Sequence, residues 1–121
     1  MYKEIKGVTP YAAYEKIKNG ALLLDVREAE EIEMMSYDVQ EQLLIPQDEL
    51  ASRLDEIPMD RAVIVACHSG NRSGEVVLFL LENKYENVYN LTGGISKWLE
   101  LELPVIWDNQ NEENVQQVHG I

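Results

Sequence analysis

One short segment gathers the residue types best suited to covalent chemistry. It reads Cys67-His68-Ser69-Gly70-Asn71-Arg72-Ser73 and contains the only cysteine of the 121-residue chain. A cysteine thiolate is a nucleophile, and a neighbouring guanidinium or helix N-terminus favours that ionised form. A lone cysteine is also a common inert core residue. The polar residues that follow Cys67 favour the reactive interpretation over the inert one.

The elements on either side of Cys67 predict a sharp turn. The apolar run Ala62–Ala66 is the clearest strand of the chain, and Ser73–Glu82 is the clearest helix. Residues 68–72 must therefore reverse direction, and Gly70 supplies the backbone freedom. In parallel α/β sheets, ligands bind beyond the carboxyl ends of the strands, and the N–H groups of such a loop form an anion cradle. We therefore expect a lowered pKa for Cys67.

Short apolar strands alternate with helices along the chain. Strands are predicted at Tyr2–Ile5, Ala21–Val26, Gln42–Ile45, Ala62–Ala66 and Asn87–Leu91. Helices are predicted from Pro10 to Asn19 and at Glu28–Met35, Pro46–Ile57, Ser73–Glu82 and Gly94–Leu101. About five such units are typical of an α/β fold whose parallel sheet is covered on both faces. We predict one domain over residues 1–107 and a polar C-terminal tail over residues 108–121.

The composition argues against several classes of function. Ten basic residues against 22 acidic ones give a formal net charge of −12, which disfavours nucleic acid and anionic membranes as partners. This charge also slows anionic substrates unless a local positive field compensates. One cysteine and two histidines give no zinc-ligand spacing, so neither a metal nor a cofactor is predicted. The single cysteine, and a first segment (MYKEIKGVTP) without the apolar core of a signal peptide, predict a cytoplasmic protein.

Three motifs resemble the rhodanese sulfurtransferases, in the order in which that family carries them. The segment Cys67–Ser73 is similar to the family's active-site pattern C-x-x-G-x-R-S. Leu23–Glu28 (LLDVRE) resembles its LIDVRE segment, and Leu91–Trp98 (LTGGISKW) resembles its L-x-G-G-x-x-x-W segment. The region of resemblance extends from about Val8 to Val105.

The resemblance implies a five-stranded parallel sheet with helices on both faces, a rhodanese-like three-layer sandwich. It also implies a ping-pong sulfur transfer, in which Cys67 takes sulfur from a small-molecule donor such as thiosulfate. The resulting persulfide passes the sulfur to cyanide or to a cellular thiol, including a protein thiol. The predicted substrate-binding residues are His68, Ser69, Gly70, Asn71, Arg72 and Ser73. Loop N–H groups would stabilise the persulfide, Arg72 would hold the anionic donor, and Ser73 would cap the helix and add a hydroxyl donor.

Two other functions stay open from the sequence. Tyrosine and dual-specificity phosphatases also use a cysteine and an arginine, but their loop is C-x5-R, whereas four residues separate Cys67 from Arg72. The tighter loop suits a single sulfur better than a phosphate or arsenate ester, which disfavours a phosphatase or arsenate reductase. A docking or sulfur-relay module is the other alternative. Many such modules lack the cysteine, and this chain keeps it.

Residues outside this chemistry are assigned supporting roles. We expect His68 at the pocket rim, since adjacent residues on a tight loop diverge. Asp25 and Arg27 are expected to brace the sheet edge. Where the family commonly carries G-H-I-P-G-A, this chain has Tyr37–Gln42, with Asp38 in place of the histidine. The lost glycines predict a different local backbone, and, if the segment borders the pocket, its negative charge disfavours thiosulfate.

Overall fold

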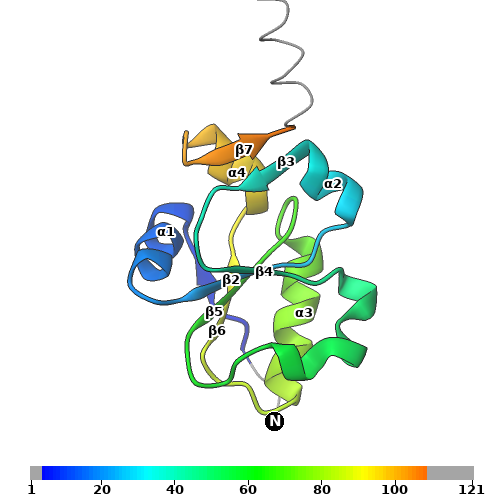
Figure 1. The fold of residues 1–121 in the computed structure, drawn as a ribbon. Helices are drawn as coiled ribbons and strands as arrows, with labels where there is room; N and C mark the ends of the chain where they lie inside the picture. The colour runs from blue at the N-terminus through cyan, green and yellow to red at the C-terminus, as the bar shows by residue number, and fades with distance from the viewer. Residues whose placement is uncertain (1–3, 109–121) are drawn as a thin grey trace, which may run out of the picture.

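The computed structural model describes residues 4–108, which build a central sheet of five parallel strands (Figure 1). These strands are β1 (Gly7–Val8), β2 (Leu22–Asp25), β4 (Gln42–Leu44), β5 (Val63–Ala66) and β6 (Val88–Leu91). Their spatial order is β1-β6-β5-β2-β4, with every neighbouring pair parallel. The predicted α/β class and the five-stranded parallel sheet are confirmed.

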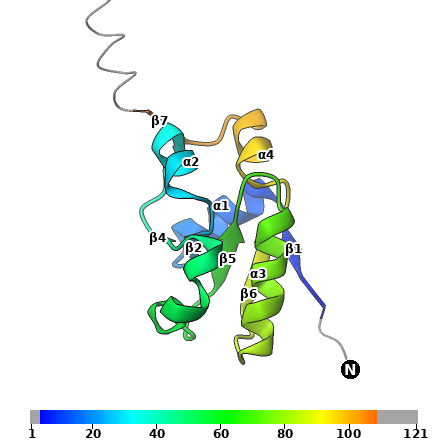
Figure 2. The ribbon, with the colours of Figure 1, turned by 90° about the vertical axis from the view of Figure 1, so that its right-hand side faces the viewer.

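Helices cover both faces of this sheet (Figure 2). They are α1 (Pro10–Lys18), α2 (Ala29–Met34), α3 (Asn71–Glu82) and α4 (Gly94–Glu100), with two 3₁₀ helices, η1 (Gln47–Glu49) and η2 (Ala51–Glu56). Apolar residues of α1 and α4 pack on one face of the sheet, and those of α3 and the 3₁₀ region pack on the other. None of the helices between residues 4 and 108 is long and apolar enough to cross a membrane.

The central strands are apolar throughout because both of their faces are buried. Leu23 joins the cluster beneath α1 and α4, while the adjacent Leu24 joins the cluster beneath α3. Both side chains have no exposed surface. The alternation of strand side chains between two faces therefore creates two separate cores. Cys67 belongs to the core on the α3 side.

Two predicted elements differ from the structure. Of the predicted strand Tyr2–Ile5, residues 2 and 3 lie outside the described residues, and residues 4 and 5 are not in a strand. The first strand within residues 4–108 is Gly7–Val8, which pairs with Asn90 and Leu91 of β6. A two-residue edge strand that contains glycine has no apolar pattern of its own. The predicted helix Pro46–Ile57 is instead the two 3₁₀ segments η1 and η2, and the second of them has a kink at Arg53, with φ −119° and ψ 21°.

A small second sheet was not predicted. It pairs β3 (Met35–Tyr37) with β7 (Val105–Trp107) in antiparallel register, Met35 opposite Trp107. Each strand has three residues, too few for a periodic pattern, and the partners lie far apart in sequence. In Figure 1 this pair lies with α2 and α4 at one end of the main sheet, the end at which β5 leads into α3. Of the predicted tail 108–121, residues 109–121 lie outside the described residues.

Candidate active site

Cys67 lies directly after β5, at the carboxyl edge of the parallel sheet. The next helix, α3, begins at Asn71, so the chain reverses within a few residues. Gly70 makes this turn possible with φ +103°, a left-handed conformation that residues with a Cβ rarely adopt. The thiol is 1% exposed and points into the loop that follows it.

Three polar groups of this loop surround the sulfur of Cys67. The backbone N–H of Gly70 donates to Sγ at 3.0 Å, and that of Ser73 donates at 3.4 Å. The thiol in turn donates to Oγ of Ser73 at 3.3 Å. The sulfur therefore lies against the N-terminal turn of a twelve-residue helix, where partial positive charge favours an anion.

These contacts outweigh burial in setting the pKa of Cys67. Burial alone raises that pKa, because a buried site disfavours charge. Hydrogen bonds from the Ser73 hydroxyl and from the N–H groups of Ser73, Gly70 and Ser69 act in the opposite direction, and the pKa of Cys67 lies below its usual value. The lowered pKa agrees with the expectation from the sequence. The physical cause is the hydrogen bonds of the loop more than the charge of Arg72.

The carbonyl groups of the loop are held away from the sulfur. The carbonyl of Cys67 accepts a hydrogen bond from the N–H of Ile95 at 3.0 Å, and that of His68 accepts from Ser96 at 3.1 Å. Both donors belong to the first turn of α4. A Cβ at Gly94 would lie 2.5 Å from the carbonyls of Cys67 and His68, so this close approach requires glycine. The Gly93-Gly94 turn at the start of α4 thus also anchors the Cys67 loop.

A buried phenol supports the same carbonyl from the other side. The Tyr37 hydroxyl donates to the carbonyl oxygen of Cys67 at 3.1 Å. Tyr37 is fully buried, and its ring packs edge-on against Trp98, with centroids 5.1 Å apart. This contact was not predicted. It links β3 to the loop and holds the first peptide after β5 in one orientation.

A second unpredicted residue, Asn90 of β6, joins the polar network. Its Oδ1 accepts a short hydrogen bond from the Ser73 hydroxyl, and its Nδ2 donates to the carbonyl of Gly70 at 3.3 Å. The only sign of this role in the sequence was that Asn90, a polar residue, interrupts a largely apolar predicted strand. Ser73 was predicted to cap α3, and this is wrong, because Gly70 occupies the N-cap. The Ser73 side chain instead lies between Cys67 and Asn90.

The remaining predicted binding residues lie at the outer side of the loop. His68, Ser69 and Asn71 are exposed. Within residues 4–108, the hydrogen bonds to Sγ come from backbone N–H groups of the loop and from Ser73, and no side chain of His68, Ser69 or Asn71 takes part. This placement agrees with His68 at the rim of the loop.

Arg72 faces α2. Its Nη1 and Nη2 donate to Oε1 and Oε2 of Glu31 at 2.9 and 3.0 Å, a bidentate pair in which both side chains are about one-third exposed. The hydrogen bond to Arg72 is the main reason that the pKa of Glu31 falls to about 2. The guanidinium predicted to hold an anionic donor is therefore occupied by a carboxylate of the protein itself.

Asp25 and Arg27 form a second ion pair, which is buried. Nε and Nη2 of Arg27 donate to the two carboxylate oxygens of Asp25 at 3.0 and 2.9 Å, and both side chains are almost fully buried. The guanidinium also lies 5.5 Å from the ring centre of Tyr37. The pair braces the end of β2, as the sequence predicted.

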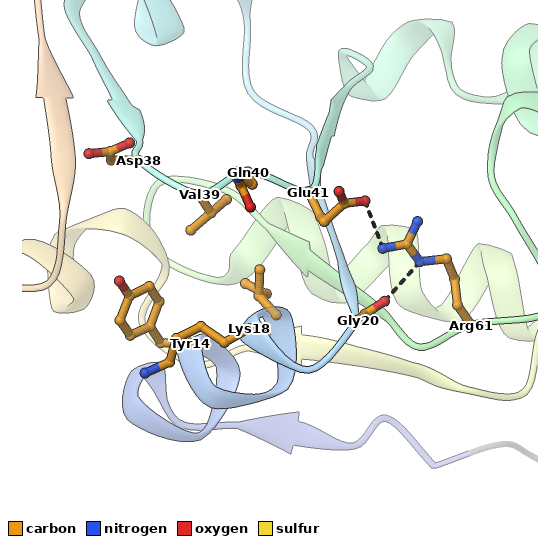
Figure 3. Close-up of a pocket in the computed structure, with 9 residues that line it drawn as sticks. Tyr14, Lys18, Gly20, Asp38, Val39, Gln40, Glu41 and Arg61 are labelled. Carbon is orange, nitrogen blue, oxygen red and sulfur yellow. Dashed lines mark hydrogen bonds and ion pairs between the residues drawn. The ribbon is translucent and has the colours of Figure 1, made fainter.

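The segment 38–41 lines a different pocket, of about 670 Å³, between α1 and the β3–β4 connection (Figure 3). Asp38 and Glu41 lie on its wall, and Arg61 donates to Glu41 at 3.0 Å and to the carbonyl of Gly20 at 2.9 Å. No residue of the Cys67 loop lines it. The predicted effect of Asp38 on the donor therefore has no basis in this geometry.

Comparisons with known proteins identify relatives of this chain. The family model of the rhodanese-like domain matches residues 9–101. A protein named thiosulfate sulfurtransferase GlpE, from Haemophilus influenzae (strain PittEE), is 34% identical over 104 residues, covering 83% of this chain and 93% of that protein. A sulfurtransferase of Allochromatium vinosum is 36% identical over 85 residues, covering 70% of this chain and 78% of that protein.

A solved structure gives the same result for the fold. The crystal structure of a rhodanese-related protein from Thermoplasma volcanium superposes with a TM-score of 0.72 at 30% identity. The match covers 84% of this chain and 97% of that one. The sheet and the helices on its two faces are therefore shared along nearly the whole length of that protein.

Proposed function

The chain belongs to the rhodanese-like domain family, and we propose that it is a sulfurtransferase that works through a persulfide on Cys67. The observation that carries the proposal is the pair of N–H groups, from Gly70 and Ser73, that converge on Sγ. Such donors stabilise negative charge on sulfur at the place where a persulfide forms. The name of the Haemophilus relative supports thiosulfate as a donor.

In the first half-reaction, the Cys67 thiolate attacks the outer sulfur of thiosulfate. A new S–S bond forms on Cys67, the bond between the two sulfur atoms of thiosulfate breaks, and sulfite leaves with the electron pair. The negative charge ends on the outer sulfur of the persulfide, one S–S bond of about 2 Å beyond Sγ. The N–H groups of the loop stabilise the negative charge of both the attacking thiolate and the persulfide product.

The Ser73 hydroxyl supports this change of charge. When Cys67 is a thiol, the thiol donates to Ser73 and the Ser73 hydroxyl donates to Asn90. When Cys67 is ionised, the same hydroxyl can rotate and donate to sulfur. Asn90 thus keeps the Ser73 hydroxyl beside Sγ, where it can donate a hydrogen bond to the Cys67 thiolate.

In the second half-reaction, a nucleophile attacks the outer sulfur and Cys67 leaves as the thiolate. With cyanide the product is thiocyanate, and with a thiolate it is a new persulfide. The chain has no second cysteine to accept the sulfur, so the acceptor is a separate molecule, either a small thiol or a protein thiol. A free, unpaired thiol of this kind fits a reducing compartment such as the cytoplasm.

The test is a steady-state assay of thiocyanate formed from thiosulfate and cyanide. The wild-type protein is expected to show parallel lines in double-reciprocal plots, the pattern of a ping-pong reaction. The Cys67→Ser variant is expected to be inactive, while Ser52→Ala, which removes an exposed hydroxyl of η2 that makes no contact with the Cys67 loop, keeps full activity. Hydrolysis of an aryl phosphate in place of sulfur transfer would overturn the proposal in favour of a phosphatase.

A further inference from the structure

We infer that Glu31 sets the donor preference of this site by opposing dianionic donors in favour of donors that carry a single negative charge. The inference rests on the proposed sulfur transfer. It states that a residue outside the Cys67 loop determines which class of sulfur donor reacts. It starts from the bidentate Glu31–Arg72 pair, which links α2 to the first turn of α3. Figures 1 and 2 both place α2 at the same end of the sheet as this loop.

Glu31 is fixed in place by two elements at once. Its Oε1 accepts from Nη1 of Arg72 at 2.9 Å and from the backbone N–H of Glu28 at 2.8 Å. The second bond is half of the capping box that begins α2. A donor that displaced Glu31 from Arg72 would therefore break two bonds to Arg72 and disturb the start of the helix.

The Glu31–Arg72 pair carries no net charge, so Arg72 offers little positive charge to a donor. Arg27, whose guanidinium also acts on Glu31, is likewise paired with a carboxylate, that of Asp25. The pKa of Glu31 is about 2, so its carboxylate is charged throughout the neutral range. Helix α2 carries two further carboxylates, Glu30 and Glu33, and no basic residue.

Donor charge is the property that this arrangement distinguishes. Thiosulfate brings two negative charges to a thiolate that already carries one. A thiosulfonate, such as the methanethiosulfonate ion, offers the same type of sulfur with one negative charge. In its reaction the thiolate forms an S–S bond with the outer sulfur, and methanesulfinate leaves with the electron pair. The two donors therefore differ mainly by the unit charge that Glu31 opposes.

The experiment compares kcat/KM for the two donors, with cyanide as acceptor. In a ping-pong reaction this constant reports the donor half-reaction alone. Glu31→Gln keeps an oxygen for Arg72 and for the N–H of Glu28 and removes the charge. We expect the ratio of kcat/KM for thiosulfate to that for methanethiosulfonate to rise about five- to tenfold, the order expected for one charge at a partly solvated site.

Two variants serve as matched controls. Glu33→Gln removes the same charge from the same helix at an exposed position outside the pair with Arg72, and is expected to change the ratio by less than about twofold because solvent screens it. Glu31→Asp keeps the charge and is expected to keep the wild-type ratio. High salt screens the charge of Glu31, and it is therefore expected to reduce the difference in the kcat/KM ratio between the wild type and Glu31→Gln.

The outcomes separate this inference from the proposed function. If Glu31→Gln changes kcat/KM for both donors by the same factor, Glu31 has a purely structural role and the inference is wrong. If neither donor transfers sulfur to Cys67 in any variant, the proposed function itself fails, and the inference with it.

Discussion

The Tyr37 hydroxyl donates to the carbonyl oxygen of Cys67 across 3.1 Å, and thereby ties the Cys67 peptide to a strand thirty residues earlier in the chain. The same carbonyl accepts from Ile95 of α4. Two separate parts of the fold thus hold one peptide group in position. The N–H groups that follow it are then free to converge on the sulfur.

Removing that hydroxyl tests how much the link stabilises the protein. Tyr37→Phe keeps the ring that packs against Trp98 and is expected to lower the free energy of unfolding by about 1 kcal/mol, the net value of a buried hydrogen bond. Urea denaturation measures it. Tyr11→Phe is the control, because Tyr11 is 57% exposed and should leave stability unchanged. Equal stability of the wild type and Tyr37→Phe would contradict the assigned link.

The Ser73 hydroxyl is expected to control the ionisation of Cys67. In Ser73→Ala the backbone N–H remains and the hydroxyl donor to the thiolate is lost, so the pKa of Cys67 rises. A higher pKa means less thiolate at neutral pH, and the pH profile of alkylation by iodoacetamide therefore shifts to higher pH. Ser69→Ala should leave the profile in place, because Ser69 contributes through its backbone N–H. A shift to lower pH in Ser73→Ala would refute this role.

Gly94 tests the close approach between α4 and the loop. In Gly94→Ala the new methyl group collides with the backbone of Cys67 and His68, and the resulting displacement of the loop is expected to reduce sulfur transfer about a hundredfold. Gly20→Ala is a matched control, since Gly20 also has a positive φ but has open space around it. The control should lose some stability and keep its activity. Equal activity of the two variants would argue against the collision.

The buried Asp25–Arg27 pair is expected to matter for stability more than for chemistry. Asp25→Ala leaves the Arg27 charge buried without its partner and should lower the free energy of unfolding by about 3–5 kcal/mol. Glu41→Gln, which weakens the exposed pair with Arg61, should cost less than about 1 kcal/mol. Thermal unfolding of both variants and of the wild type measures the two losses of stability. A similar small loss in each would show that the buried pair is not the brace described above.

The sequence was most informative where the interacting residues are close neighbours. The Cys67–Ser73 loop, the start of α1 at Pro10 and the Asp25–Arg27 brace each depend on residues a few positions apart. Local spacing therefore predicted the turn, the lowered pKa of Cys67 and the bracing role of Asp25 and Arg27, while the ion pair between these two residues was seen only in the structure.

The contacts that complete the site could not be predicted in this way. Glu31 lies 41 positions from Arg72, Tyr37 lies 30 from Cys67 and Asn90 lies 17 from Ser73. Each pair forms only when separate strands or helices meet at the carboxyl edge of the sheet. The motif indicated Arg72 as a ligand for the donor, and only the folded chain brings it against Glu31.

Formation of a persulfide on Cys67 is the most direct test of this account. The measurement is the intact mass of the purified protein after brief exposure to thiosulfate, beside Cys67→Ser treated identically. We predict a gain of one sulfur atom in the wild type, reversed by cyanide and absent from the variant. An unchanged mass, with Cys67 still open to alkylation and with methanethiosulfonate equally without effect, would contradict it.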